Sequence, residues 1–305
     1  MQRTFTRFIR KWCVGMENNK TKIAFVVLHY RAIEDTRECI RSILEHIEND
    51  GVHVIVVDNC SPDGSGQSLY DEYRKNAFVT VIRNDKNLGF ANGNNVGYKY
   101  AKDVLNAEYI VLCNNDILVF QKDFVERLDL EFQDSHFAVL GPMILTKDGK
   151  FTSSPSRVKP LNKADVEELL KYYTWCYRFN KVFMLKFYYL WRKLRGKKKV
   201  KTFNEYYKKQ YNVSLHGCFM VFSRVYINEF DGLNDSTFMY GEEEILYKMI
   251  LDHKMKSVYT PEIAVFHKED ASTNSVHKSG HSKKDFYYRN LVKSTRVLLD
   301  LYKYI

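Results

Sequence analysis

Polar side chains stand at the ends of three apolar runs in the first half of this 305-residue chain. If the runs are neighbouring parallel strands, their carboxyl ends meet at one sheet edge, where ligands of such sheets bind. A carboxylate there can accept hydrogen bonds from a nucleotide base or bind a hard divalent cation. A single Asp or Asn after a strand is usually a turn residue, but three such sites on one edge favour ligand binding. The residues are Tyr30, Arg31, Asp58, Asn59, Asn115 and Asp116.

Three consecutive glutamates begin a predicted amphipathic helix over 241–254. The helical spacing places Glu242 on the apolar stripe, so we expect its side chain to point inward. Glu244 lies four residues before Lys248, and we expect these two to form an ordinary ion pair at the surface. A carboxylate such as Glu242 or Glu243 can take the proton of a hydroxyl as a general base. Acids in a first helical turn can also merely complement the helix dipole.

Small and amide residues dominate 87–97, between a predicted strand and the helix that follows it. Gly89, Asn94 and Asn95 would let the backbone approach a ligand there and present N–H donors at a helix start. Two other nucleotide motifs do not occur in the sequence: a glycine fingerprint after the first strand and G-x-x-x-x-G-K-[ST]. Their absence argues against a Rossmann dehydrogenase and a P-loop enzyme.

Strands and helices alternate in the first half of the chain, which predicts an α/β fold with a mostly parallel sheet flanked by helices. The apolar runs that predict strands are 22–28, 52–58, 78–83, 108–113, 214–223 and 257–267. The segments with helical character are 34–48, one near 92–103, 160–212, 241–254 and the basic amphipathic tail from about 283.

Positive charge is concentrated in two segments. The net charge is +10, but 171–210 holds 13 Lys or Arg with one acid, and 1–22 holds six with one acid, which leaves −7 for the rest. The segment 171–210 also carries 13 aromatic side chains. That mixture suits an anionic membrane surface, stacking on nucleic acid, or a packed helical insert with a solvated basic face. The distribution argues against a general polyanion-binding surface.

The six cysteines are scattered and form neither a zinc-ribbon nor a disulfide pattern, which predicts a reducing cytosol. Because no run approaches 18 apolar residues, we expect no membrane-spanning helix. The first twelve residues include basic side chains without an apolar signal core, so we expect no secretory signal.

Six sequence blocks, in order, resemble glycosyltransferase family 2 with a GT-A fold. Their order and spacing are similar to those of bacterial rhamnosyltransferase-like and galactosyltransferase-like members that build surface polysaccharides. The resemblance covers about 24–145 and 214–290. The blocks are HYR, VVDNCSPDGS, RNDKNLGFANGNNVG, YIVLCNNDI, FMYGEEE and VFHKED.

The resemblance implies a role for each candidate. Tyr30, Asp58 and Asn59 match positions that bind the nucleotide base, and 89–95 matches the loop beside the sugar donor. Asn114-Asn115-Asp116 matches the D-x-D element that holds a metal on the donor diphosphate. The element is N-x-D in this chain, so the metal would rest mainly on Asp116. His267 matches a histidine that completes metal or diphosphate binding. Without the resemblance, we would interpret it as a structural residue at a strand end.

Glu243 aligns with the catalytic base of the family, which is Asp in many relatives. Ile245 stands where relatives often carry an acid. The assignment of the base therefore stays open between Glu243 and Glu242.

The resemblance implies an inverting, metal-dependent transfer of a hexose from a nucleotide-diphosphate sugar to a saccharide acceptor, with Mn²⁺ or Mg²⁺ as cofactor. A polyprenyl-linked acceptor in surface polysaccharide synthesis would place the protein in the cytoplasm, peripheral on the inner face of the plasma membrane. It also favours an anionic membrane over nucleic acid as the partner of 171–210. Two alternatives are a catalytically inactive family member in a complex and a sugar-1-phosphate nucleotidyltransferase.

The resemblance and the charge pattern together predict five regions. They are a basic N-terminal extension (1–22), a nucleotide-sugar-binding half (23–145), a basic aromatic helical insert (146–213), an acceptor and catalytic half (214–282) and a C-terminal amphipathic helix (283–305).

Overall fold

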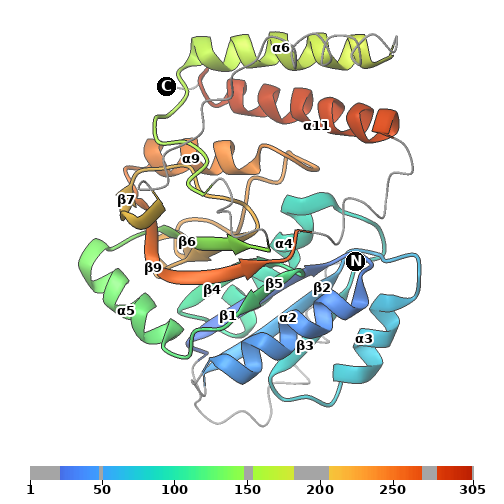
Figure 1. Ribbon diagram of the computed structural model, residues 1–305, viewed down its shortest axis with the longest axis vertical. Helices are drawn as coiled ribbons and strands as arrows, with labels where there is room; N and C mark the ends of the chain where they lie inside the picture. The colour runs from blue at the N-terminus through green and yellow to red at the C-terminus, as the bar shows by residue number, and fades with distance from the viewer. Residues whose placement is uncertain (1–20, 48–50, 148–153, 182–205, 270–279, 304–305) are drawn as a thin grey trace.

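The strands of the described residues, nine in all, form a single sheet with helices on both of its faces (Figure 1). The computed structural model describes residues 21–47, 51–147, 154–181, 206–269 and 280–303. The order of the strands is β3-β2-β1-β4-β8-β6-β9-β5, and β7 pairs with β9 beside this path.

The first half of the chain forms a parallel sheet, as the alternation of strands and helices predicts. Each of its strands begins and ends within one residue of the predicted run. The strands β1, β2 and β4 are almost entirely buried because helices cover both faces, which explains their continuous apolar character, whereas the edge strand β3 is mostly half-buried. The elements are β1 (Ile23–His29), α2 (Ile33–His46), β2 (Val52–Asp58), α3 (Ser65–Tyr73), β3 (Val79–Arg83), α4 (Gly89–Lys99), which continues as the π-helical turn η1 (Tyr100–Val104), and β4 (Tyr109–Asn114).

The second half makes the sheet mixed. β8 runs antiparallel to both β4 and β6, whereas β9 is parallel to β6 and antiparallel to β5 and β7. The elements are β5 (Ile117–Val119), α5 (Phe124–Ser135), β6 (Val139–Thr146), α6 (Lys163–Lys181), β7 (Gln210–Tyr211), β8 (Phe219–Phe222), α8 (Arg224–Ile227), α9 (Glu242–Asp252), β9 (Ser257–His267) and α11 (Gly280–Asp300).

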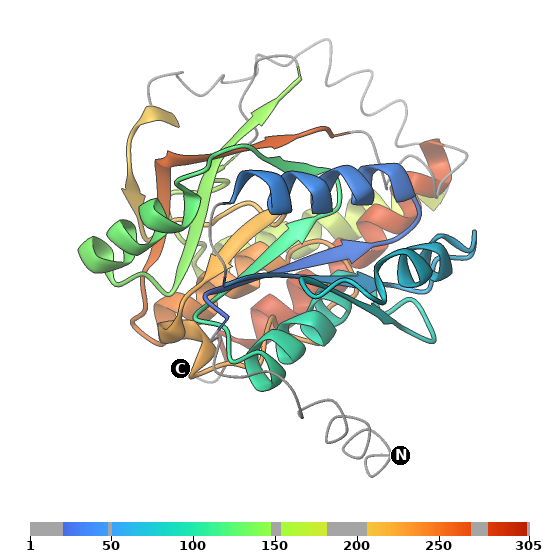
Figure 2. The same ribbon diagram turned by 90° about the horizontal axis from the view of Figure 1, so that it is seen from below.

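Two hydrophobic cores lie on opposite faces of the sheet. Helices α2 and α5 cover one face, where Phe25, Phe124 and Phe219 pack together. Helices α4, α8 and α9 cover the other face, where the rings of Tyr98 and Phe222 meet edge to face. In Figure 2, α2 and α4 accordingly lie on either side of the strands.

Helices α6 and α11 lie side by side as a further layer beyond α9 (Figure 1). Cys176 of α6 and Tyr288 and Leu291 of α11 form the buried centre of their contact, which several other aromatic residues of α6 surround. The first part of the basic aromatic segment is therefore packed against the C-terminal helix. Its continuation, 182–205, lies outside the described residues, and 206–212 contains β7 rather than the predicted helix.

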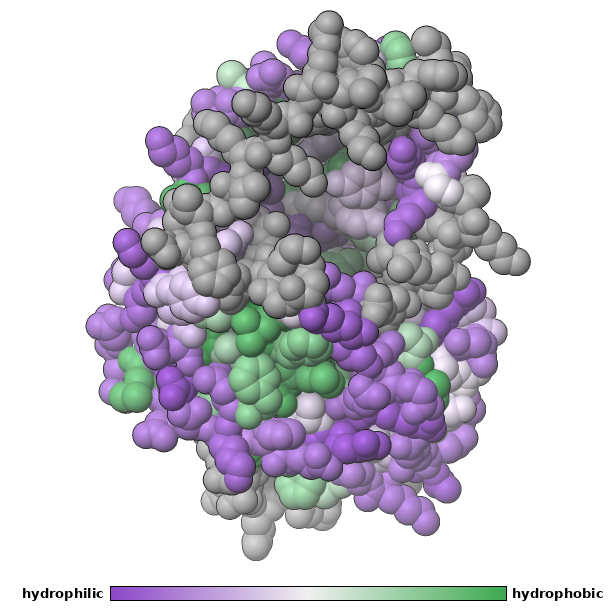
Figure 3. Space-filling view, in the orientation of Figure 1, coloured by the Kyte–Doolittle hydropathy of each residue, from purple (hydrophilic) through white to green (hydrophobic). Residues whose placement is uncertain are grey.

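No helix in the described ranges is both long enough and apolar enough to cross a lipid bilayer. Figure 3 shows hydrophobic side chains gathered near the centre of one face, within a largely hydrophilic surround. They lie over the region of β5 and β9 in Figure 1. Beyond the end of β5, Phe120 is 43% exposed.

Candidate functional site

The carboxyl ends of β1, β2 and β4 meet at one edge of the sheet. His29 is the register partner of Asp58, and Leu28 is the partner of Asn114. Tyr30 and Arg31 follow β1 directly, and the Arg31 guanidinium lies 5.6 Å from the centre of the Tyr30 ring. The parallel pairing thus brings the predicted strand-end residues together.

Asp58 is buried at the end of β2, against the start of α3. Its Oδ1 accepts a hydrogen bond of 3.0 Å from the Ser61 amide. A Cβ at Gly66 would overlap the Asp58 carboxylate, so glycine is required for this approach. The neighbouring His29 is fully buried between the hydroxyls of Thr36 (2.7 Å) and Ser65 (2.8 Å). Burial lowers the pKa of His29, which favours a neutral ring at this edge.

Asn59 uses its side-chain amide to hold the loop before α4. Its Nδ2 donates to Asn87 Oδ1 (3.1 Å) and to the Gly89 carbonyl (2.9 Å). Its Oδ1 accepts from the Leu88 amide (2.9 Å) and from Asn84 Nδ2 (3.2 Å). Both ends of the amide are therefore engaged within the protein.

The start of α4 is locked to the loop that precedes α9. Gly89 has a φ of 81°, and a Cβ there would overlap the Phe238 carbonyl. Asn95 exchanges two hydrogen bonds with the backbone of Leu233, donating at 2.8 Å and accepting at 2.7 Å. Asn94 donates to a carbonyl one turn earlier. Its Oδ1 is buried with no hydrogen-bond partner in the part of the chain that the structure describes.

Asp116 and His267 meet where β4 and β9 end. Asp116 Oδ1 lies 3.2 Å from His267 Nε2, and both side chains are largely buried. His267 Nδ1 is buried without a hydrogen-bond partner among the described residues. Asn115, between β4 and β5, donates to Thr36 Oγ1 at 3.0 Å.

This pair fits a metal site that is completed by a ligand. Asp116 Oδ1 and His267 Nε2 face each other at 3.2 Å, so that one cation between them could take both atoms as ligands. Hard divalent cations take mainly oxygen ligands. Within the described ranges, no three His, Cys, Asp or Glu side chains group as metal ligands. A cation held by Asp116 and His267 would therefore need further oxygens from a bound diphosphate or from water.

The glutamates at the start of α9 have different environments. Glu242 is 5% exposed, which confirms its predicted inward orientation, and its Oε1 accepts from Thr237 Oγ1 at 3.0 Å. Burial, and then the charge of Glu243, raise the pKa of Glu242 to about 7. Glu243 is half-buried, and its Oε1 lies 2.6 Å from where a Cβ of Gly217 would stand.

The prediction of a surface ion pair between Glu244 and Lys248 was wrong. Glu244 instead accepts a hydrogen bond of 3.1 Å from Arg157 Nε. Lys248 is largely buried, pairs with Asp252 and lies over the Tyr302 ring. The segment before α6 and the end of α11 cover this side of α9, so neither side chain faces solvent as the local spacing suggests.

His216 is a candidate that sequence reasoning did not identify. Its Nδ1 accepts from the Cys218 amide at 3.2 Å, so a neutral ring carries its proton on Nε2. Its ring centre lies 6.4 Å from that of His267, and the charge of Glu243 acts on it. Burial lowers the pKa of His216. The sequence offered only a histidine within the predicted strand 214–223, because its place beside His267 depends on the pairing of β8 with β4.

Comparisons with known proteins identify the family and the fold. The model of the family described as "Glycosyl transferase family 2" matches residues 24–229. The low-salt glycan biosynthesis hexosyltransferase Agl10 of Haloferax volcanii is 24% identical over 137 residues, which are 45% of this chain and 41% of that protein.

Two solved structures share the fold at low sequence identity. S. aureus TarS 1–349 superposes with a TM-score of 0.51 at 13% identity, over 81% of this chain and 60% of that chain. GalNAc-T7 with UDP, GalNAc and Mn²⁺ has a TM-score of 0.56 at 13% identity, over 92% of this chain and 48% of that chain. The chain thus spans less than two thirds of each of these relatives.

The parallel strand ends, the curled mixed sheet and a family match over more than half of the sequence lead to one conclusion: the chain belongs to glycosyltransferase family 2 and has the GT-A fold.

Proposed function

We propose that the chain transfers a hexose from a nucleotide-diphosphate sugar to a saccharide acceptor, with inversion at the anomeric carbon. The observation that carries the proposal is the contact between Asp116 and His267, whose Nδ1 is buried without a partner among the described residues. It lies at the strand ends where ligands of such sheets bind. In this proposal 23–145 holds the donor, and 214–282 supplies the acceptor side and the catalytic acids.

The donor would be held by the strand ends and oriented by a cation. Tyr30 offers a ring for stacking on the base, with Arg31 beside it, and Asp58 offers a carboxylate for hydrogen bonding. Asp116 and His267 would hold Mn²⁺ or Mg²⁺ on the diphosphate. The cation would supply charge neutralisation for the leaving nucleoside diphosphate. Support comes from GalNAc-T7, whose structure contains UDP and Mn²⁺.

Glu243 is our choice for the general base. Glu242 is almost fully buried and accepts a hydrogen bond from Thr237, whereas Glu243 faces Gly217 and acts on His216, which neighbours His267. The carboxylate of Glu243 would take the proton of the acceptor hydroxyl while its oxygen attacks the anomeric carbon. The attack comes from the face opposite the leaving diphosphate, so the configuration inverts.

The test is nucleotide release from candidate donors. A panel of nucleotide sugars is first screened for thermal stabilisation of the wild type, and the stabilising donor is then incubated with and without Mn²⁺. We expect Mn²⁺-dependent release of the nucleoside diphosphate, faster with a suitable acceptor, and its loss in Asp116→Ala. Release that is independent of Mn²⁺ and of Asp116 would contradict the proposed site.

We further propose a polyprenyl-linked acceptor in surface polysaccharide synthesis, used by a cytoplasmic protein that binds the inner face of the plasma membrane peripherally. The support is the charge of 171–210 and the aromatic content of its sequence after α6, since the aromatic residues of α6 itself pack against α11. Each basic side chain near an anionic surface contributes about 1 kcal/mol, which salt screens. In this proposal the segment binds lipid headgroups rather than nucleic acid.

Vesicle co-sedimentation tests this attachment. We expect the wild type to bind anionic vesicles more strongly than neutral ones and to be released by salt. Changing Lys197, Lys198 and Lys199 together to Gln should weaken the binding. Equal recovery on both lipids would refute the electrostatic attachment.

A further inference from the structure

Strand β9 carries a bulge before it reaches the candidate metal site. Along the parallel pairing with β6, Pro142 faces Thr260 but the next residue, Met143, faces Ala264. Residues 261–263 are therefore extra on β9, and their backbone groups lose the regular ladder. Such groups bond instead to other partners, side chains or water; here the Glu262 carbonyl is exposed and the Ala264 amide is part-buried.

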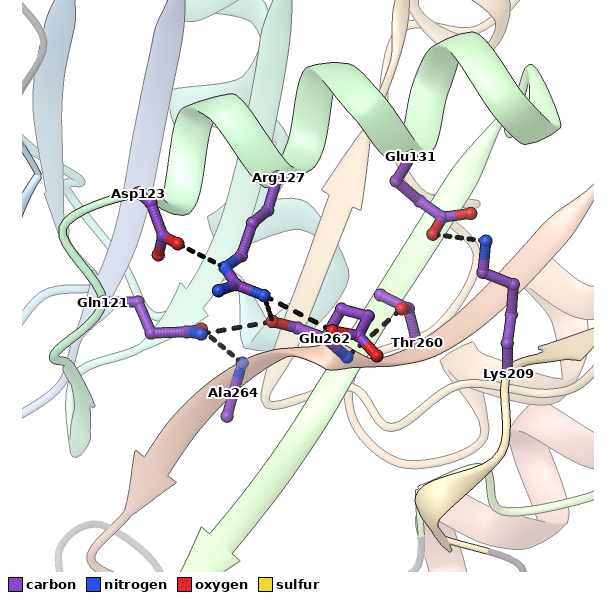
Figure 4. Close-up of polar contacts among 8 residues, drawn as sticks. All are labelled: Gln121, Asp123, Arg127, Glu131, Lys209, Thr260, Glu262 and Ala264. Carbon is purple, nitrogen blue, oxygen red and sulfur yellow. Dashed lines mark hydrogen bonds and ion pairs between the residues drawn. The ribbon is translucent and has the colours of Figure 1, made fainter.

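Two side chains from the β5–α5 connection and α5 supply those partners (Figure 4). Gln121 donates from Nε2 to the Glu262 carbonyl (3.1 Å) and accepts at Oε1 from the Ala264 amide (2.6 Å). Arg127 donates to the same Glu262 carbonyl at 3.2 Å and is itself held by Asp123 at 2.6 Å. The amide of Gln121 thus takes the place of a neighbouring peptide group.

The position of Gln121 makes it an extension of β5. The last ladder pair between the two strands is Val119 with Val265, and β5 ends there. Two residues further along, the Gln121 side chain bonds the backbone on both sides of Ile263. It therefore bridges the end of the bulge, at the residue where the pairing of β9 with β6 resumes.

The register beyond the bulge decides which side chain meets Asp116. With the observed pairing, His267 lies opposite Ile117, the residue after Asp116, and its ring contacts the Asp116 carboxylate. A slip of one residue turns every following side chain to the other face of the sheet. His267 would then leave Asp116, although the bonds that Gln121 and Arg127 make to β9 go to Glu262 and Ala264 rather than to His267.

We propose that Gln121, assisted by Arg127, is a positioning residue that keeps β9 in the register placing His267 against Asp116. This inference rests on the proposed function, because the proposed function is what makes His267 a metal ligand. Gln121 acts through the backbone of β9 and touches neither the donor nor the cation.

Other contacts also hold β9, so the expected effect is graded. Ile263 and Val265 are fully buried in the core, and Lys268 pairs with Asp35 and Glu38 of α2. Loss of the Gln121 amide should therefore leave the fold intact and loosen the end of the strand. Substitution of a residue that holds a metal ligand in place typically lowers metal affinity by about 10–100-fold. We expect a loss of about tenfold for Gln121→Ala.

The experiment compares Gln121→Ala with Gln133→Ala, a control on the exposed side of α5. Calorimetry measures Mn²⁺ affinity in the presence of UDP, and NMR follows the His267 ring signals, identified by their loss in His267→Gln. We expect Gln121→Ala to bind Mn²⁺ about tenfold more weakly, with recovery of turnover at saturating Mn²⁺, and to shift the His267 signals. Arg127→Gln, which removes the bonds to Glu262 and Asp123 but leaves the Gln121 bonds in place, should change both in the same direction but less.

The outcomes separate this proposal from the proposed function. If the wild type binds no Mn²⁺ with UDP, the metal assignment fails, but the His267 signals still test the positioning. Unchanged His267 signals in a folded Gln121→Ala would overturn the inference. So would equal shifts in Gln121→Ala and Gln133→Ala. If Gln121→Ala does not fold, Arg127→Gln decides by the same two measurements.

Discussion

Two groups of polar side chains near the site differ in their hydrogen bonding. One group is the amides of the first half of the chain, and the other is the ionisable side chains near β8, β9 and the start of α9. The side-chain amides of Asn59 and Asn95 are hydrogen-bonded to backbone groups of neighbouring loops. His267 keeps a buried nitrogen without a partner among the described residues, and Glu242 has a strongly raised pKa. Proximity to the site therefore does not by itself indicate chemistry.

The difference follows from hydrogen-bond capacity. A side-chain amide can donate to a backbone carbonyl and accept from a backbone N–H. The favourable free energy of two such hydrogen bonds holds a loop in place. A buried carboxyl or imidazole with an incomplete set of partners is costly unless a ligand completes it. We accordingly expect substitutions at Asn59 and Asn95 to lower stability, and substitutions at Asp116, His267 and Glu243 to lower turnover.

The largest effect should come from Asp116→Ala. It removes the only carboxylate of the N-x-D element, and charge stabilisation by a metal is worth several kcal/mol, or at least about 10³-fold in rate. His267→Ala should reduce transfer less, because a carboxylate remains for the cation. Both are measured as transfer rates across a Mn²⁺ titration. Normal transfer by Asp116→Ala would remove this pair from the catalytic group.

Glu243→Gln should come next. Glutamine keeps the shape of the side chain but cannot accept a proton, so turnover should fall by roughly 10²–10⁴-fold while donor binding is retained. Steady-state kinetics together with donor binding by calorimetry check this. Glu242→Gln is the matched control. If it alone loses turnover and Glu243→Gln stays active, the base is Glu242.

Glu242 should also make stability depend on pH. Its pKa rises from an ordinary value near 4.5 to about 7 on folding, so the folded state binds more protons between these values. Its contribution is therefore most favourable at low pH, and stability falls as pH rises from about 4.5 to about 7, by on the order of 3 kcal/mol. Denaturant unfolding of the wild type and of Glu242→Gln should show this fall only in the wild type. Parallel pH profiles would contradict the raised pKa.

The smallest effect on chemistry should come from Asn95→Ala. Loss of two buried hydrogen bonds to Leu233 should lower the free energy of unfolding by about 2 kcal/mol, while turnover of the folded protein changes less than in Glu243→Gln. Denaturant unfolding and kinetics on the same preparation measure both quantities. A large loss of turnover at unchanged stability would move Asn95 from the structural group to the substrate-binding one.

Local patterns in the sequence were enough for much of the sheet and for part of the site. The apolar runs of β1 and β2 predicted buried parallel strands because burial on both faces requires continuous hydrophobicity. The helical spacing of α9 correctly placed Glu242 on the inner stripe, because that depends only on neighbouring residues. The family resemblance was carried by short blocks of the same local kind.

Only the tertiary structure decided the contacts between distant segments. Asn95 meets Leu233, Glu244 meets Arg157, and His216 comes beside His267 through strand pairings and helix packing that local spacing does not encode. The mixed sheet and the bulge of β9 likewise depend on pairing between segments that are distant in the sequence. The physical reason is that these contacts depend on how distant segments pack in the folded chain. The periodicity of a sequence indicates only which face of a single helix or strand is buried.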